Sequence, residues 1–407
     1  MFEIRTITEE DVDLFRSRLS RGFGGDADSD ETSAERFAAI FEYDRTLAAF
    51  DGDDIIGTGA AFSLGVTVPG GATVPMGGTT VISVQPTHRR RGVLRALMDR
   101  HLADVAERGE PIAGLWASES SIYGRFGYGP ASYRHKASIE AKAIEFFEDA
   151  EKGSVRLIDP DHAGPILKDV YEAVRPTRAG MLTRSQDWWT HRLLSDPTSW
   201  RGNKSSLRYA TFHEGEEVTG YASYRQKENW EDFLANGEVS VTEVFTTTPR
   251  AHTGLWQFLT NIDLFPNLEW WNMPIDDPLV AKVTDSRRVK RTLIDALWIR
   301  IMDIPAALSA RSYESAGVVT FEVHDATRPD SSGTYRLECR DGIGTCERVG
   351  VSADLVFDTS VLGHLYLGGG DAATMAAAGR VEGDLESVRT LHRLFHTDQP
   401  PWCPEVF

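Results

Sequence analysis

The chain contains the stretch Val81-Ile82-Ser83-Val84-Gln85-Pro86-Thr87-His88-Arg89-Arg90-Arg91-Gly92-Val93-Leu94-Arg95, which decides its fold. The apolar, β-branched beginning predicts a strand, and the middle predicts a basic turn. From Gly92 onward apolar side chains recur at helical spacing up to a stop at Gly109. A strand that passes through a basic, glycine-containing loop into a helix presents unpaired backbone N–H groups at the positive end of the helix dipole. The stretch therefore predicts a binding site for phosphate.

The arginine cluster Arg89, Arg90 and Arg91 could also be a solvated basic turn. In a chain with a formal net charge of −18, however, three consecutive arginines at a strand-to-helix junction favour a role as counter-charges for a pyrophosphate. Two common nucleotide sites do not fit. The sequence has no Gly-Lys-Ser or Gly-Lys-Thr of a P-loop, and the three-glycine dinucleotide fingerprint is missing.

Length and charge limit the other possibilities. A chain of 407 residues predicts two or three domains, since domains typically have roughly 100–150 residues. The acidic balance argues against a nucleic acid or an anionic membrane as partner and fits a cationic small molecule. An acidic surface that only prevents self-association is the alternative.

The cysteines and the N-terminus point to an ordinary intracellular protein. Cys339, Cys346 and Cys403 match no metal or redox spacing, so we expect them to be reduced and structural, and we expect no metal. The N-terminal residues lack the layout of a signal peptide, and no run reaches about 18 apolar residues. We expect a cytosolic protein without a membrane span, with leaderless export as an alternative.

The sequence pattern divides the chain into three parts. Residues 1–150 alternate helices and strands as a mixed α/β domain. Residues 151–300 repeat this plan, and residues 301–407 combine alternating strands with short helices. A proline- and aromatic-rich tail ends the chain, and we expect it to pack onto the body.

The second part carries a weaker copy of the phosphate loop. Pro249, Arg250 and Gly254 precede an apolar helix with nearly the spacing of the first loop, but two of the three arginines are absent. We interpret this as a repeated fold with an emptied phosphate loop. Chance similarity between two strand-to-helix connections is the alternative.

An acidic loop in the first part is a candidate substrate contact. Asp26, Asp28, Asp30 and Glu31 lead into a helix that carries Phe37. Carboxylates beside an aromatic helix attract an amine, so Asp26 and Phe37 are candidate substrate-binding residues. A solvated acidic face is the alternative.

Several motifs together resemble one family. Arg89 to Leu94 look like the acetyl-CoA pyrophosphate loop of the GNAT acetyltransferases, although Leu94 departs from the small residue that ends this pattern. The wider set resembles the enhanced intracellular survival (Eis) acetyltransferases of actinobacteria. Its members are Pro86 to Gly92, Ser118-Glu119, Ile122-Tyr123-Gly124-Arg125-Phe126-Gly127-Tyr128-Gly129-Pro130, Leu362 to Gly369 and Ala372 to Arg380.

The resemblance implies an architecture and an activity. It implies tandem GNAT domains with mixed central sheets and flanking helices, the second domain without cofactor. A sterol-carrier-protein-like α+β domain follows them, and the whole chain forms a homohexamer built as a trimer of dimers. Acetyl-CoA would be the co-substrate, and amines of aminoglycosides would accept the acetyl group. Protein lysine side chains are an alternative acceptor, and a non-catalytic lipid- or cofactor-binding scaffold is an alternative function.

The resemblance also implies site residues. Tyr123 would be the general acid, with Tyr128 as a competitor that spacing alone cannot separate from it. The terminal carboxylate of Phe407 would be the general base, and the negative charge of Glu405 would attract a cationic substrate. The sequence does not predict the exact position of the Phe407 carboxylate. The implied contacts to acetyl-CoA are Ile82, Ser83, Val84, Arg89, Arg90, Arg91, Gly92, Val93, Leu94, Arg95, Ser118 and Glu119.

Overall fold

The structure is a computed structural model that describes residues 2–25, 33–148 and 154–407. The chain forms two compact units, each assembled from separate segments. The first unit comprises Met1–Ser132, Arg178–Arg184 and Ala296–Phe407, and the second comprises Tyr133–Thr177 and Ser185–Asp295. Within the described residues, none of the helices has the length and apolar character needed to cross a membrane.

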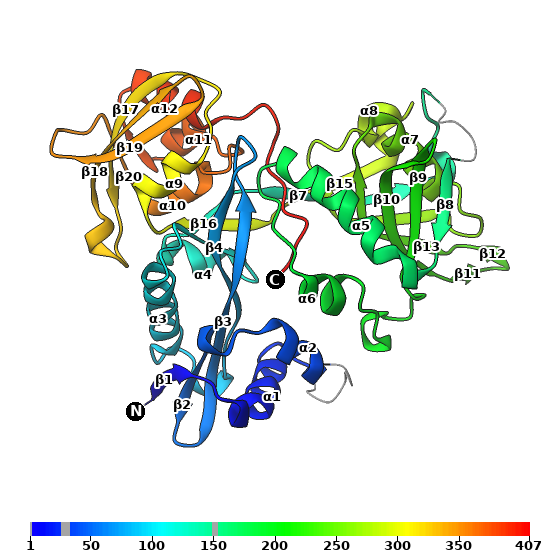
Figure 1. Cartoon of the computed structure of the whole chain (residues 1–407), viewed down its shortest axis with the longest axis horizontal. Helices are drawn as coiled ribbons and strands as arrows, with labels where there is room; N and C mark the ends of the chain where they lie inside the picture. Colours follow the sequence, from blue (N-terminus) through cyan, green and yellow to red (C-terminus); the bar gives the residue numbers. More distant parts are fainter. Residues whose placement is uncertain (1, 26–32, 149–153) are drawn as a thin grey trace. The chain divides into compact units, whose positions relative to one another are not determined.

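A 7-stranded sheet in the order β1-β2-β3-β4-β5-β16-β6 forms the centre of the first unit (Figure 1). Its strands are β1 (Glu3–Thr6), β2 (Thr46–Asp51), β3 (Asp54–Thr67), β4 (Thr73–Val84), β5 (Ile112–Trp116), β6 (Gly129–Pro130) and β16 (Leu297–Ile301). The helices of this part are α1 (Val12–Gly22), α2 (Ser33–Ile40), α3 (Val93–Glu107) and α4 (Ser120–Tyr123). The strand, basic turn and helix that the sequence predicts around the arginine cluster are confirmed.

Alternation along β2 explains how helices cover both faces of the sheet. Leu47 and Ala49 pack with Leu97 of α3, whereas Ala48 and Phe50 between and beyond them pack with Phe15 of α1. Successive side chains of a strand point to opposite faces, so a fully apolar strand needs a cover on each side. The face under α3 continues into a core that β16 completes with Trp298.

Strand pairing links distant parts of the chain. β16 pairs with β5 through the register from Leu297 opposite Trp116 to Ile301 opposite Ile112, so it belongs to the first sheet. In the second unit β7 (Tyr133–Glu140) pairs with β14 and β15. Strand pairing therefore crosses the boundaries that the sequence suggests at residues 150 and 300, and those boundaries stay a prediction.

The second unit is built on another 7-stranded sheet, in the order β15-β7-β14-β13-β10-β9-β8. Its other strands are β8 (Val155–Ile158), β9 (Arg208–Glu214), β10 (Glu217–Lys227), β13 (Glu238–Thr246), β14 (Asn267–Pro274) and β15 (Val289–Asp295), beside the short hairpin β11 (Trp230–Glu231) and β12 (Leu234–Ala235). Its helices are α5 (Pro160–Val174), α6 (Gln186–Trp188), α7 (Pro249–Thr260) and α8 (Leu279–Lys282). Trp189, Trp256 and Trp270 fill its interior.

The C-terminal part of the first unit contains a 5-stranded sheet in the order β19-β18-β17-β20-β21. Its strands are β17 (Gly317–His324), β18 (Gly333–Arg340), β19 (Ile343–Val349), β20 (Leu355–Asp358) and β21 (Val381–Gly383). Its helices are α9 (Ile304–Ala310), α10 (Thr359–Leu365), α11 (Ala372–Ala377) and α12 (Leu385–Phe395). The tail from Pro401 to Glu405 is buried, which confirms that it packs onto the body.

Candidate active site

A cavity of about 800 Å³ lies in the first unit beside the end of β4 and the start of α3. Of the predicted acetyl-CoA contacts, only Arg91 is absent from its lining. The structure brings together Ile82, Ser83, Val84, Arg89, Arg90, Gly92, Val93, Leu94, Arg95, Ser118, Glu119 and Tyr123. The other lining residues are Gly22, Phe23, His88, Ser121, Ile122, Arg125 and Phe126.

The cavity exists because β4 and β5 separate. These parallel strands pair only from Met76–Gly78 to Ile112–Gly114, although β4 continues to Val84. In the described parts of the chain, the backbone groups of β4 beyond Gly78 therefore have a strand partner only on the β3 side. The edge that faces away from β3 is open to a ligand with amide groups, which can pair with it as an added strand would.

A β-bulge turns β4 at this point. The pairing of β3 with β4 shifts register between Thr58 and Ala60, and Val81 on the opposite strand has a φ of 48°. A β-branched residue in the left-handed region is strained, so its surroundings must hold it there. The Thr58 hydroxyl does so by donating a hydrogen bond to the Val81 carbonyl oxygen across 2.8 Å.

The start of α3 offers an anion site. Gly92 takes a φ of 85° as the residue before the helix, and no side chain of the described residues caps the first turn. The N–H groups of that turn have no acceptor inside the helix and carry its positive dipole end. Among the described residues, Arg89, Arg90, Arg91 and Arg95 form no ion pair, so their charges are available to a phosphate.

The corresponding helix of the second unit differs at this position. α7 begins after Thr248, whose side chain accepts a hydrogen bond from the N–H of Ala251. The chain itself therefore satisfies a donor that α3 leaves for a ligand. This difference supports the interpretation that the second phosphate loop is empty.

The structure distinguishes the two candidate tyrosines. Tyr123 at the end of α4 lines the cavity, and burial raises the pKa of its hydroxyl against the opposing effect of a hydrogen bond with Ser118. Tyr128 is fully buried below it, with its ring centre 6.2 Å from that of Tyr123. The Tyr128 hydroxyl lies 2.9 Å from Thr79 Oγ1, which lies 2.6 Å from His101 Nε2. Its hydroxyl is thus bound inside the core.

The last residue of the chain lies where β4 and β5 separate. Phe407 is only 8% exposed. Its ring is packed so closely on Gly78 that a Cβ at this position would be 3.1 Å from Phe407 Cε2. Gly78 is also the last β4 residue paired with β5. The terminal residue therefore meets the sheet at the mouth of the separated strands.

The predicted substrate contacts are placed differently from one another. Glu405 is buried and forms an ion pair with Arg184, so its charge is compensated within the unit. Phe37 is buried in the core beside α1 and stacks on Phe41, whose ring centre is 4.1 Å away. Asp26 lies outside the described residues. The assignment of Asp26, Phe37 and Glu405 to substrate binding stays a prediction.

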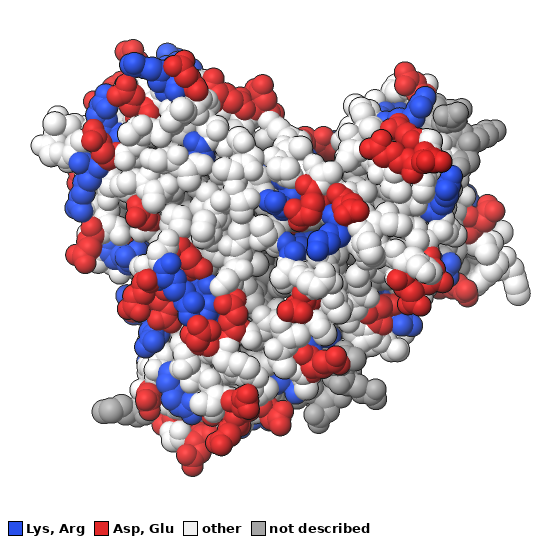
Figure 2. Space-filling model, viewed as in Figure 1, with Lys and Arg blue, Asp and Glu red and all other residues white. Residues whose placement is uncertain are grey.

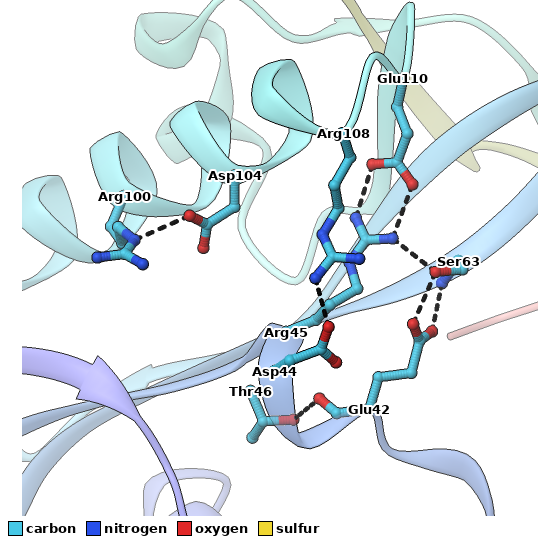
Figure 3. Close-up of polar contacts among 9 residues, drawn as sticks. All are labelled: Glu42, Asp44, Arg45, Thr46, Ser63, Arg100, Asp104, Arg108 and Glu110. Carbon is cyan, nitrogen blue, oxygen red and sulfur yellow. Dashed lines mark hydrogen bonds and ion pairs between the residues drawn. The ribbon is translucent and has the colours of Figure 1, made fainter.

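A charge network around the buried pair of Arg45 and Glu110 was not predicted from the sequence (Figure 3). Arg45 donates two hydrogen bonds of 2.7 Å to Glu110 and a third of 2.7 Å to the hydroxyl of Ser63, which in turn donates to Glu42. A Cβ on Gly77 would meet both Glu110 and Arg45, at 2.9 and 3.1 Å. The network therefore fixes the strands directly before the point where they separate.

Three further kinds of site would each need features of their own in the described part of the chain: a metal centre, a reactive cysteine and a nucleic-acid-binding surface. No group of three or more His, Cys, Asp or Glu side chains there could hold a metal ion. The three cysteines are buried, and burial raises the pKa of Cys339 to about 11. On the face drawn in Figure 2, carboxylates and cationic side chains of the described residues are interspersed, without a continuous basic surface of the kind that binds nucleic acid.

Comparison with protein families gives the class. Residues 3–131 match an acetyltransferase (GNAT) domain, residues 180–301 match a second acetyltransferase (GNAT) domain, and residues 304–404 match a sterol carrier protein domain. The separated strands and the uncapped helix after a basic loop fit these matches. The chain is an N-acetyltransferase with tandem GNAT domains, which implies the use of acetyl-CoA.

Comparison with individual proteins gives the family. The chain is 36% identical over 357 residues to N-acetyltransferase Eis of Mycobacterium tuberculosis, which covers 86% of this chain and 85% of the relative. An uncharacterized N-acetyltransferase of Streptomyces avermitilis is 38% identical over 412 residues, which cover 100% of this chain and 99% of the relative. The chain therefore belongs to the Eis family of N-acetyltransferases.

Solved structures agree with this membership. Eis1 from Mycobacterium abscessus superposes with a TM-score of 0.86 at 30% identity and covers both chains completely. A GCN5-related N-acetyltransferase from Anabaena variabilis superposes with a TM-score of 0.85 at 18% identity, again over 100% of both chains, which shows a shared fold.

Proposed function

We propose that the chain transfers the acetyl group of acetyl-CoA to an amine of a cationic small molecule such as an aminoglycoside. The observation that carries the proposal is the convergence of three features on one cavity. These features are the open edge of β4, the uncapped start of α3 beside the arginines, and the buried Tyr123. The net charge of −18 favours a cationic acceptor.

The chain's own groups fit the parts of CoA. The backbone of Ile82, Ser83 and Val84 would pair with the amides of the pantetheine arm. The pyrophosphate would be bound by the N–H groups of the first turn of α3 and by the side chains of Arg89, Arg90, Arg91 and Arg95. Ser118 and Glu119 would contact CoA from the side of the cavity that faces β4. Acetyl-CoA supplies the thioester-bound acetyl group, and the residues around it supply position and charge.

Tyr123 would act as the general acid. A tyrosine hydroxyl is protonated near neutral pH, and burial raises the pKa of this one further, so it can give its proton to the thiolate that leaves when the amine attacks directly. Tyr128 is less suitable, because it is fully buried and does not line the cavity. The choice of Tyr123 rests on this difference in placement.

The terminal carboxylate of Phe407 would act as the general base. The packing of the Phe407 ring on Gly78, at the mouth of the separated strands, supports this role. The carboxylate would accept a proton from the ammonium group of the substrate, directly or through water, so that the neutral amine can attack the thioester carbonyl. The same negative charge would help to hold a cationic acceptor.

A turnover screen tests the proposal. Purified protein is given acetyl-CoA together with aminoglycosides, polyamines or lysine peptides, and released thiol is measured. We expect turnover with aminoglycosides and saturable acetyl-CoA binding in calorimetry. Binding without turnover of any amine would favour the scaffold, and turnover of lysine peptides alone would favour a protein-lysine acetyltransferase.

The assembly and location that the resemblance implies belong to the same proposal. We expect a homohexamer in solution and a cytosolic location. Light scattering coupled to size-exclusion chromatography measures the first, and cell fractionation measures the second.

A further inference from the structure

The C-terminal tail is anchored by a segment from a distant part of the chain. Residues 178–184 run along the end of β3, where the N–H of Thr67 donates to the Met181 carbonyl oxygen across 2.8 Å. On their other side the N–H of Trp402 donates to the carbonyl oxygen of Ala179 across 2.9 Å. This segment is therefore an adaptor between the first sheet and the tail.

Arg184 ends this adaptor and forms an ion pair with Glu405 of the tail. The arginine side chain is 0% exposed and the carboxylate side chain 4% exposed. A buried charge is strongly unfavourable without its partner. Movement of the tail would break this buried ion pair, so the pair restrains the tail beyond what apolar packing does.

The ion pair also limits where the terminal carboxylate can be. Only Val406 separates Glu405 from Phe407, and two residues of extended chain span at most about 7 Å. The ring of Phe407 adds a second fixed point through its contact with Gly78. Two contacts thus limit the position of the carboxylate: the ion pair of Glu405 with Arg184 and the packing of the Phe407 ring on Gly78.

We infer that Arg184 is a positioning residue for acetyl transfer, because it holds the tail through Glu405 and thereby sets the place of the Phe407 carboxylate. The inference rests on the proposed function, in which that carboxylate is the base. It assigns Glu405 to the tail anchor, with its charge directed at Arg184 rather than at the substrate.

This inference gives the second GNAT-type segment a part in catalysis. Arg184 lies in the part of the chain that matches the second GNAT domain, residues 180–301, yet it belongs to the first compact unit. The second domain lacks the arginine-rich phosphate loop, but Arg184 near its beginning holds the tail that carries the proposed base. The N-terminal domain, residues 3–131, does not contain this anchor.

The test replaces Arg184 in the full-length chain. We expect Arg184→Met to lower kcat about 100-fold, since a misplacement of about 1 Å can cost this much, and to leave the KM for acetyl-CoA within about twofold. Arg184→Lys keeps the charge and should recover part of kcat. Hydrogen exchange should show faster exchange of the tail amides in Arg184→Met, including that of Trp402.

A matched control separates positioning from general stability. Arg225→Met removes an arginine of the second unit that pairs with Asp196 across 2.6 Å and is also mostly buried. This control should keep kcat. An unchanged kcat in Arg184→Met, an unchanged exchange rate of the tail, or an equal loss in Arg225→Met would overturn the inference.

A separate variant distinguishes failure of the inference from failure of the proposed base. An enzyme with one glycine added after Phe407 keeps the Arg184–Glu405 pair but moves the carboxylate. Full activity of this enzyme would reject the terminal base and the catalytic role of Arg184 together, even if the tail exchange showed that Arg184 holds the tail. Loss of activity in the extended enzyme, with normal kcat in Arg184→Met, would reject only the anchor.

Discussion

Arg300 of β16 donates a hydrogen bond to Asp325 across 2.7 Å, and the two side chains are 0% and 1% exposed. The same guanidinium donates to the carbonyl oxygen of Phe126, in the segment that follows Tyr123. One buried arginine therefore joins the segment of the proposed acid to the sterol-carrier-like part of the chain. The third domain is in this way a support for the proposed active site.

Replacing Arg300 should destabilise the first unit. Arg300→Met leaves the Asp325 carboxylate buried without its charged partner, and we expect a loss of about 3–5 kcal/mol in the free energy of unfolding. Urea unfolding of the full-length protein measures this loss. Arg340→Met is the control, because the pair of Arg340 with Glu338 is exposed and should change stability by less than about 1 kcal/mol. Similar urea midpoints for the two variants would contradict the prediction.

Removing the Tyr123 hydroxyl should affect chemistry rather than cofactor binding. We expect Tyr123→Phe to lower kcat by about 10²–10⁴-fold, the range of general acid catalysis, with an unchanged dissociation constant for acetyl-CoA. Thiol release and calorimetry measure the two quantities. Tyr335→Phe, which removes a hydroxyl that donates to Ser331 in the third domain, should keep full turnover.

The local part of this site could be predicted, and the long-range part could not. The stretch from Val81 to Arg95 carries its own signals: β-branched residues, a glycine for a left-handed turn and helical periodicity. The place of β16 in the sheet depends on its pairing with β5, almost two hundred residues earlier in the chain. No local sequence pattern predicts this pairing. Likewise the difference between Tyr123, which lines the cavity, and Tyr128, which is bound to Thr79 of β4 in the core, arises from contacts with distant parts of the chain.

Charge pairs show the same limit. The acidic Glu405 could be predicted to matter, but its partner Arg184 could not, since a sequence shows the charges without their distances. Phe37 is a related case. Its position on a short amphipathic helix is equally compatible with a core residue and an exposed aromatic contact, and packing with Phe15 places it in the core.

The arginine loop should act on the phosphates of the co-substrate alone. We expect Arg89→Ala combined with Arg90→Ala to raise the KM for acetyl-CoA about 10-fold or more, because each charge-assisted hydrogen bond contributes about 1.5–3 kcal/mol. Both side chains are exposed, so the urea midpoint should not change. S-acetylpantetheine, which lacks the pyrophosphate, should be used equally well by the variant and the unmodified enzyme.

The control for this prediction lies on the same helix. Arg100→Ala removes an exposed arginine of α3 that pairs with Asp104 away from its N-terminus. This variant should keep the KM for acetyl-CoA. An equal increase of KM for acetyl-CoA and S-acetylpantetheine in the loop variant would show that the arginines act on the fold rather than on phosphate.

His101 should make the stability of the first unit depend on pH. Burial, with a smaller effect of the Arg45 charge, lowers the pKa of His101 to about 3, whereas an unfolded histidine titrates near 6.5. Between these values the unfolded chain binds a proton that the folded chain does not. Stability from this residue is therefore complete above about pH 6.5 and falls by about 1.4 kcal/mol per pH unit toward pH 3. His101→Gln, which retains a hydrogen-bonding partner for Thr79, should flatten this dependence in urea unfolding between pH 6 and 4. An equal slope in both proteins would show that His101 is protonated in the folded state.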